Sequence, residues 1–214
     1  PDSVRAHAPA FRAAAGIHEL AVPAARQARG KALVDGVVRS AFNRRFGVGS
    51  YPLYRRWYER RWTRAQRARA ACVEALGSIA QLPPVFDAAR RWSERQYRRA
   101  RDLSAARRQL EHIQPDVVWS TFCVTPLEHP YYLAARDLGI PVDTSILSFD
   151  NLTSRGVIPE YDHYLVWHEK MRDQLMRLYP RTRTEQVTIT GTPQFDFHRN
   201  AAYTWSRDET LRRL

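Results

Sequence analysis

The stretch that decides the fold is Leu138-Gly139-Ile140-Pro141-Val142-Asp143-Thr144-Ser145-Ile146-Leu147. A helical pattern ends at Leu138, because Gly139 and Pro141 interrupt it. The apolar run that follows, from Val142 to Leu147, predicts a buried strand. A helix that leads directly into a buried strand is one step of an alternating α/β chain, so the same alternation is expected on either side of it.

Short apolar runs alternate with helical stretches throughout the second half of the chain. Besides residues 142–147, strands are predicted at residues 116–120, 164–167 and 187–190. Helices are predicted at residues 126–138 and 168–179. Strands separated by helices of this length form parallel sheets through βαβ units. We therefore expect an α/β fold of three layers, with a Rossmann-like parallel sheet and flanking helices.

The first half differs in both pattern and charge. Residues 39–111 are nearly all helical in pattern, with a basic helix expected over residues 86–113, and residues 18–23 fit a strand. Residues 1–111 contain 23 lysines and arginines against 9 acidic residues, whereas residues 112–214 contain 11 against 13. We therefore predict a basic, mostly helical region over residues 30–112.

Residues 51–69 predict a helix that carries an aromatic stripe among many arginines. The stripe consists of Tyr51, Tyr54, Tyr58 and Trp62, with Trp57 beside it. Three interpretations stay open: packing of the stripe on the sheet, contact with an anionic membrane surface, and binding of nucleic acid. No helix-turn-helix, zinc-finger or RNA-recognition signature accompanies the segment, so no specific nucleic acid is expected as a partner.

Polar side chains are concentrated in the loop after the strand that ends at Leu147. They are Asp150, Asn151, Thr153, Ser154 and Arg155. In open α/β sheets, ligands bind beyond the carboxyl ends of the strands, so this position predicts a binding or catalytic site. The same residue types also bond to neighbouring backbone N–H groups in ordinary loops and helix caps. The residues alone leave both interpretations open.

Two further pairs of candidate residues follow predicted strands. Glu128 and His129 come after the strand at residues 116–120, and Thr192 and Gln194 come after the strand at residues 187–190. Each pair is placed to contact a substrate at the carboxyl edge of the sheet, and the segment that contains Thr192 and Gln194 would also serve as a hinge bordering a cleft. The alternative for His129 is a capping or packing role, and the alternative for the second pair is a simple turn that leaves the domain.

Several common functional signatures are absent from the sequence. His163 and His168 lie across a predicted strand-to-helix junction and would not share a face, so no metal site is predicted. There is no Walker loop, no G-x-G-x-x-G, no apolar run near the roughly 18 residues of a membrane span, and no signal-peptide pattern. Cys72 and Cys123 are predicted to be buried free thiols, which favours a reducing, cytoplasmic compartment.

Five motifs of the second half follow one another in a fixed order. They are Pro115-Asp116-Val117-Val118, Ala134-Ala135-Arg136-Asp137-Leu138-Gly139-Ile140-Pro141, Ser148-Phe149-Asp150-Asn151-Leu152-Thr153-Ser154-Arg155-Gly156, Asp162-His163-Tyr164-Leu165-Val166-Trp167 and Val187-Thr188-Ile189-Thr190-Gly191-Thr192-Pro193-Gln194-Phe195-Asp196. Together they resemble the N-terminal domain of bacterial GT-B-type glycosyltransferases. The likeness is strongest to a surface-polysaccharide group related to CDP-glycerol glycerophosphotransferases and UDP-N-acetylglucosamine 2-epimerases, and it covers roughly residues 113–210.

The resemblance implies an enzyme with two Rossmann-like domains that face a cleft. Residues 1–197 would form the acceptor-binding domain, and residues 198–214 would be the linker and the start of a donor-binding domain. Ser206 and Glu209 have the spacing of a capping box, which predicts a helix start there. The donor is expected to be a nucleotide-sugar, specifically a UDP-sugar. Residues 1–214 would hold no cofactor and would be inactive without the second domain.

The same resemblance implies roles for the candidate residues. Asp150 would be the catalytic base, or would orient the acceptor hydroxyl. Asn151, Thr153, Ser154, Arg155, Glu128, His129, Thr192 and Gln194 would bind substrate. The acceptor would be a sugar or a lipid-linked sugar used in cell-surface polysaccharide synthesis, at the inner face of the plasma membrane.

The sequence departs from both related groups at the candidate loop. It has neither the His-Val-Glu-Ala-Gly of the epimerases nor the Trp-His-Gly-Thr of the transferases, so position carries over better than residue identity. An epimerase-like enzyme that acts on the sugar nucleotide itself is the first alternative. The alternative from another class is a non-catalytic basic module that binds an anionic membrane or nucleic acid.

Overall fold

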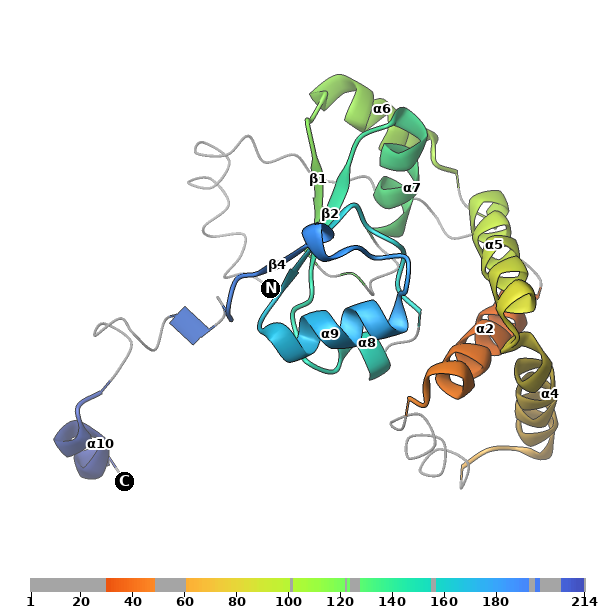
Figure 1. Cartoon of the computed structure of the whole chain (residues 1–214), viewed down its shortest axis with the longest axis horizontal. Helices are drawn as coiled ribbons and strands as arrows, with labels where there is room; N and C mark the ends of the chain where they lie inside the picture. The colour runs from red at the N-terminus through yellow and green to blue at the C-terminus, as the bar shows by residue number, and fades with distance from the viewer. Residues whose placement is uncertain are drawn as a thin grey trace.

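The computed structural model describes residues 30–48, 61–100, 102–121, 123, 128–154, 157–192, 195–196 and 205–213. Helices α2, α4 and α5 of the first half lie together on one side, and a four-stranded sheet with its helices forms the neighbouring part (Figure 1). The strand predicted at residues 18–23 and most of the predicted aromatic stripe lie outside the described residues.

The sheet is parallel throughout. Its strands are β1 (Val118–Ser120), β2 (Val142–Ser145), β3 (His163–Val166) and β4 (Val187–Ile189), and they lie side by side in sequence order. The register pairs Val118 with Val142, and Val166 with Ile189. This confirms the predicted α/β fold with a Rossmann-like parallel sheet. The strand expected to reach Leu147 ends at Ser145, although the N–H of Ile146 still donates to the carbonyl of Leu165 at 2.9 Å.

The helices predicted at residues 126–138 and 168–179 are confirmed by α7 (His129–Leu138) and α9 (Glu169–Leu178). The connection between β2 and β3, predicted as a loop, contains the single helical turn α8 (Asn151–Ser154), and the 3-10 turn η1 (Thr184–Gln186) precedes β4. Helix α7 ends because Gly139 adopts a φ of 72°, which glycine reaches without strain. Helix α9 begins after His168, whose ring accepts a hydrogen bond from the N–H of Met171.

The first half is helical, but its helix boundaries differ from those predicted. The helices are α2 (Lys31–Phe46), α4 (Arg64–Ala80), α5 (Pro83–Ala100) and α6 (Ser104–Ile113). The prediction of one basic helix over residues 86–113 is wrong, because residues 102–103 are not helical and α6 begins anew at Ser104, whose N–H donates to the Asp102 carboxylate at 2.8 Å. The predicted helix through residue 62 is also wrong there, because Thr63 and Gln66 form a capping box that starts α4.

Helices α2 and α4 approach each other closely at a glycine. A Cβ added to Gly77 would lie 2.6 Å from the Cβ of Ser40, so only glycine fits at this crossing. The hydroxyl of Ser40 and the guanidinium of Arg44 both donate to the Glu74 carboxylate, at 3.0 and 2.8 Å. Helices α2 and α4 are therefore held together by close backbone packing and by hydrogen bonds from α2 to the Glu74 carboxylate of α4.

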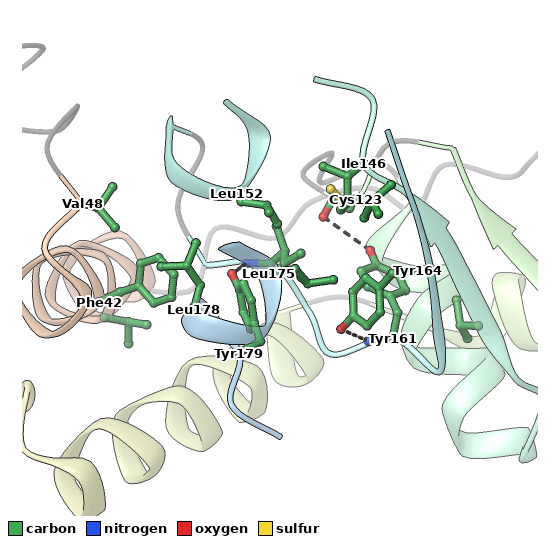
Figure 2. Packing of buried hydrophobic residues seen from close by; sticks show 14 of the residues in the cluster. Phe42, Val48, Cys123, Ile146, Leu152, Tyr161, Tyr164, Leu175, Leu178 and Tyr179 are labelled. Atoms are coloured by element: carbon green, nitrogen blue, oxygen red, sulfur yellow. Dashed lines mark hydrogen bonds between the residues drawn. The ribbon is translucent and has the colours of Figure 1, made fainter. Parts of the chain in front are cut away.

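One continuous apolar core joins the helical part to the sheet. Figure 2 shows Phe42 of α2 beside Leu178 and Tyr179 at the end of α9. The rings of Phe42 and Tyr179 have centroids 5.7 Å apart, and Phe86 of α5 stacks on Phe42 at 6.3 Å. Since these contacts link α2, α5 and α9, burial of the aromatic rings holds the basic helices against the α/β part.

The structure tests two further predictions, the burial of the two cysteines and the helix start at Ser206. Cys123 is buried as expected, but the prediction that Cys72 is buried is wrong, because α4 turns that residue to solvent. The helix start predicted at Ser206 is confirmed: α10 (Arg207–Arg213) follows it, and the hydroxyl of Ser206 accepts from the N–H of Glu209 at 3.2 Å. Among the described helices, none has the length and apolar character needed to cross a membrane.

Candidate functional site

The parallel sheet brings several candidate segments to one edge. Because all four strands run the same way, the residues that follow them meet at the carboxyl edge. Glu128 comes after β1, Asp150 after β2, Trp167 after β3 and Thr192 after β4. The three candidate segments that the sequence singled out are therefore placed along a single border of the sheet.

Asp150 closes the turn that follows β2. Its carboxylate accepts a hydrogen bond from the hydroxyl of Ser148 at 2.5 Å, and the side chain is partly exposed. Its carbonyl accepts from the N–H of Thr153 at 3.0 Å and from the Thr153 hydroxyl at 3.3 Å. The backbone of Asp150 thus starts α8, while its carboxylate is held by a hydroxyl within reach of solvent.

Asn151 is the most unusual residue of this loop. It is 3% exposed, and its Oδ1 has no hydrogen-bond partner among the described residues. A buried polar atom without a partner costs about 1–3 kcal/mol, so such atoms concentrate where a function requires them. The neighbouring Leu152 is fully buried, which anchors the single turn of α8 against the core.

The remaining residues of the candidate set have different surroundings. The hydroxyl of Thr153 is used within its own turn. Ser154 is the last residue of α8. In the turn after β4, the backbone carbonyl of Thr192 accepts a hydrogen bond from the N–H of Phe195 at 2.9 Å. Arg155 and Gln194 lie outside the described residues.

Aromatic side chains that the sequence pattern alone did not single out border the same edge. Phe149, directly before Asp150, is 68% exposed. Trp167 and Phe195, which follow β3 and β4, contact each other in a T-shaped arrangement with ring centroids 6.1 Å apart. The signal that could have found them is an aromatic residue within a few positions of three successive strand ends. Phe149 and Phe195 are exposed, whereas Trp167 is partly buried against the core, and exposed rings at such a sheet edge are typical of a ligand-binding surface.

Glu128 and His129 follow β1 but have separate surroundings. The Glu128 carboxylate accepts from the hydroxyls of Ser120 at 2.6 Å and Thr121 at 3.0 Å, which ties the start of α7 to the end of β1. The ring of His129 stacks on Tyr97 of α5 with centroids 4.1 Å apart. His129 lines a cavity of about 500 Å³ beside α5, whose described lining does not include Asp150.

Burial determines the protonation of the groups beneath this edge. It raises the pKa of the Cys123 thiol to about 12, so Cys123 is a neutral thiol at physiological pH and is not a nucleophile. Burial also raises the pKa of Tyr161, whose hydroxyl lies 3.4 Å from the carbonyl of Cys123 (Figure 2). In the part of the chain that the structure describes, no three histidine, cysteine or acidic side chains are grouped to hold a metal ion.

Comparison with known proteins finds no matching family model, no matching curated protein and no matching solved structure. The resemblance to GT-B glycosyltransferases therefore stays a prediction that depends on the five sequence motifs of the second half.

Proposed function

We propose that this chain is the acceptor-binding half of a nucleotide-sugar-dependent glycosyltransferase in cell-surface polysaccharide synthesis. One observation carries the proposal: at the carboxyl end of β2, Asp150 presents a partly exposed carboxylate, and the next residue, Asn151, has a buried amide oxygen with no described partner. This edge is where open α/β sheets bind their ligands. A partly exposed carboxylate is suited to hold a substrate hydroxyl, because its oxygens can accept the hydrogen bond that the hydroxyl donates.

In the proposed reaction, Asp150 takes the proton of the acceptor hydroxyl. The hydroxyl oxygen then bonds to the anomeric carbon of the donor sugar as the bond from that carbon to the nucleoside diphosphate breaks. Asn151 orients the hydroxyl, and the exposed rings of Phe149 and Phe195, with the partly buried ring of Trp167, offer flat apolar surfaces to a sugar ring. The donor, which we expect to be a UDP-sugar, is held by a second domain that stabilises the leaving diphosphate.

The acceptor would be a sugar or lipid-linked sugar presented at the inner face of the plasma membrane. The basic composition of residues 1–111 supports this location, because arginine side chains are attracted to anionic headgroups.

The substitution Asp150→Asn in the complete natural protein tests the proposal. It keeps the size of the side chain and can still accept from the Ser148 hydroxyl, but it cannot take a proton. Loss of a general base costs about 10²–10⁴ in rate, so kcat should fall by that factor while the melting temperature changes little. The measurement is release of nucleotide from a panel of UDP-, GDP-, CDP- and dTDP-sugars in the presence of acceptor sugars.

The matched control is Asp116→Asn, which makes the same change of charge before β1, at the opposite edge of the sheet. It should leave kcat within a few-fold of the original. Equal activity of both variants would show that Asp150 only shapes its loop. Conversion of UDP-N-acetylglucosamine to its 2-epimer without any acceptor would favour the epimerase-like alternative, and residues 1–214 alone should release no nucleotide.

A further inference from the structure

A cavity of about 500 Å³ lies at the junction of the helical part and the α/β part. Its walls come from α2, from one face of α5, from the start of α7 and from the segment that leads into β3. Cavities of about 300–1,000 Å³ at the junction of two structural parts are common sites for small ligands. The described residues of the Asp150 loop do not line it, so it is a separate site from the one proposed above.

The cavity is unusually rich in arginine. Among the described residues, six arginines line it, against four acidic residues. Four of the arginines are paired with carboxylates, at distances between 2.7 and 3.0 Å: Arg90 with Glu160, Arg98 with Asp137, Arg136 with Asp162, and Arg181 with Asp87. These ion pairs join α5 and α7 to the neighbouring segments. In each pair, the positive charge of the arginine is balanced by a carboxylate.

The other two arginines have no such partner. Arg39 of α2 and Arg91 of α5 are exposed and make no ion pair or hydrogen bond with a described residue. Their helices are joined beside the cavity, because the hydroxyl of Ser93 donates to the Asp35 carboxylate at 2.7 Å. Two guanidinium groups without a partner among the described residues, brought to one cavity from two joined helices, are suited to bind an anion with several oxygens.

Aromatic rings form another wall of the same cavity. Tyr97 is buried and stacks on His129 with an interplanar angle of 19°, and Tyr132 meets the His129 ring edge-on at 5.7 Å. The hydroxyl of Tyr132 donates to the carbonyl of Glu160, which keeps its ring in position. The cavity therefore combines free positive charge with a flat, rigid aromatic surface.

We propose that this cavity binds a small phosphate monoester attached to a ring, with Arg39 and Arg91 holding the phosphate and the Tyr97–His129–Tyr132 wall contacting the ring. Guanidinium groups bind phosphate oxygens in a bidentate way, which makes phosphate a better match than a carboxylate of lower charge. The inference does not depend on the proposed transferase activity. The ring could be a sugar or a nucleoside, and the experiment separates these two sources.

The experiment measures binding by titration calorimetry on the chain of residues 1–214. The probes are glucose 1-phosphate, uridine monophosphate, inorganic phosphate, glucose and uridine. At least one of the two phosphorylated probes should bind, with an affinity that falls as salt is raised, while glucose and uridine should not bind. Whichever phosphorylated probe binds more tightly identifies the ring.

The double substitution Arg39→Gln with Arg91→Gln should weaken that binding at least tenfold. Both side chains are exposed and lack described partners, so the variant should fold and keep its melting temperature. The matched control is Arg99→Gln, on the opposite face of α5 and outside the cavity lining, which should leave the affinity unchanged.

Three results would overturn the proposal. They are failure of both phosphorylated probes to bind, equal affinity in the double variant, and inorganic phosphate binding as tightly as the ring-bearing probes. Loss of the Asp150-dependent reaction would leave this test unaffected, because the two sites share no described residue.

Discussion

The two cysteines of the chain have opposite environments, and a chemical test distinguishes them. Cys72 lies exposed on α4, and Cys123 is 3% exposed after β1. Only a thiolate reacts with an alkylating reagent, and with a pKa of about 12 roughly one Cys123 side chain in 10⁴ is ionised at pH 8. Iodoacetamide at pH 8 should therefore modify Cys72 and leave Cys123 unmodified, as read by mass spectrometry of the digested protein.

The control for this labelling is Cys72→Ser. The folded variant should take up almost no reagent, and the same variant in denaturant should take up one equivalent. Rapid modification of Cys123 in the folded variant would contradict the buried position of that thiol.

At the scale of the elements, the crossing of α2 and α4 depends on Gly77. Alanine there would gain about 1 kcal/mol of helix propensity. Its Cβ would, however, lie 2.6 Å from the Cβ of Ser40 and 3.3 Å from the backbone nitrogen of Ala41, and that backbone cannot move aside easily. Overpacking costs about 1–3 kcal/mol, so Gly77→Ala should lower the free energy of unfolding in urea.

Gly36→Ala is the matched control on the facing helix. The Cβ added at Gly36 would lie 3.3 Å from Cγ1 of Val73, a side chain that can shift. The gain in helix propensity should therefore roughly offset the steric cost of this contact. The change in unfolding free energy should stay within about 1 kcal/mol. If Gly77→Ala proved as stable as Gly36→Ala, the close approach of α2 and α4 would be wrong.

At the scale of the whole molecule, buried phenols and a buried thiol make the fold sensitive to alkali. Burial raises the pKa of Tyr132 and Tyr164 from 10.0 to about 12, and it also raises the pKa of Tyr161 and Tyr179. In the unfolded chain these groups lose their protons at lower pH than in the folded chain. The folded state therefore binds more protons above about pH 9, and its stability must fall as pH rises.

We expect the urea midpoint to be nearly constant up to about pH 9 and to fall progressively between about pH 9 and 12. Each buried tyrosine contributes up to about 1.4 kcal/mol per pH unit within that window. Tyr132→Phe removes one of these groups and should make the dependence less steep, although it also loses the hydrogen bond to Glu160. A midpoint that is flat to pH 11 would contradict the burial of the tyrosine cluster.

The sequence alone determined the order and type of the elements. The apolar runs predicted all four strands, Gly139 predicted the end of α7, and Ser206 predicted the start of α10. These signals are local, because a helix cap or a buried strand depends on residues within a few positions. The parallel sheet then followed from the alternation, and it placed the Asp150 loop at the carboxyl edge.

Only the tertiary structure decided which residues from distant segments meet. The burial of Asn151, the exposure of Cys72 and the stacking of His129 on Tyr97 depend on how the helices pack. The same holds for Arg39 and Arg91, which reach one cavity from two separate helices. Local sequence pattern specifies a helix and which of its faces is apolar. The partner of each face depends on how shapes fit and surfaces are buried across the whole chain, so a short stretch of sequence does not determine it.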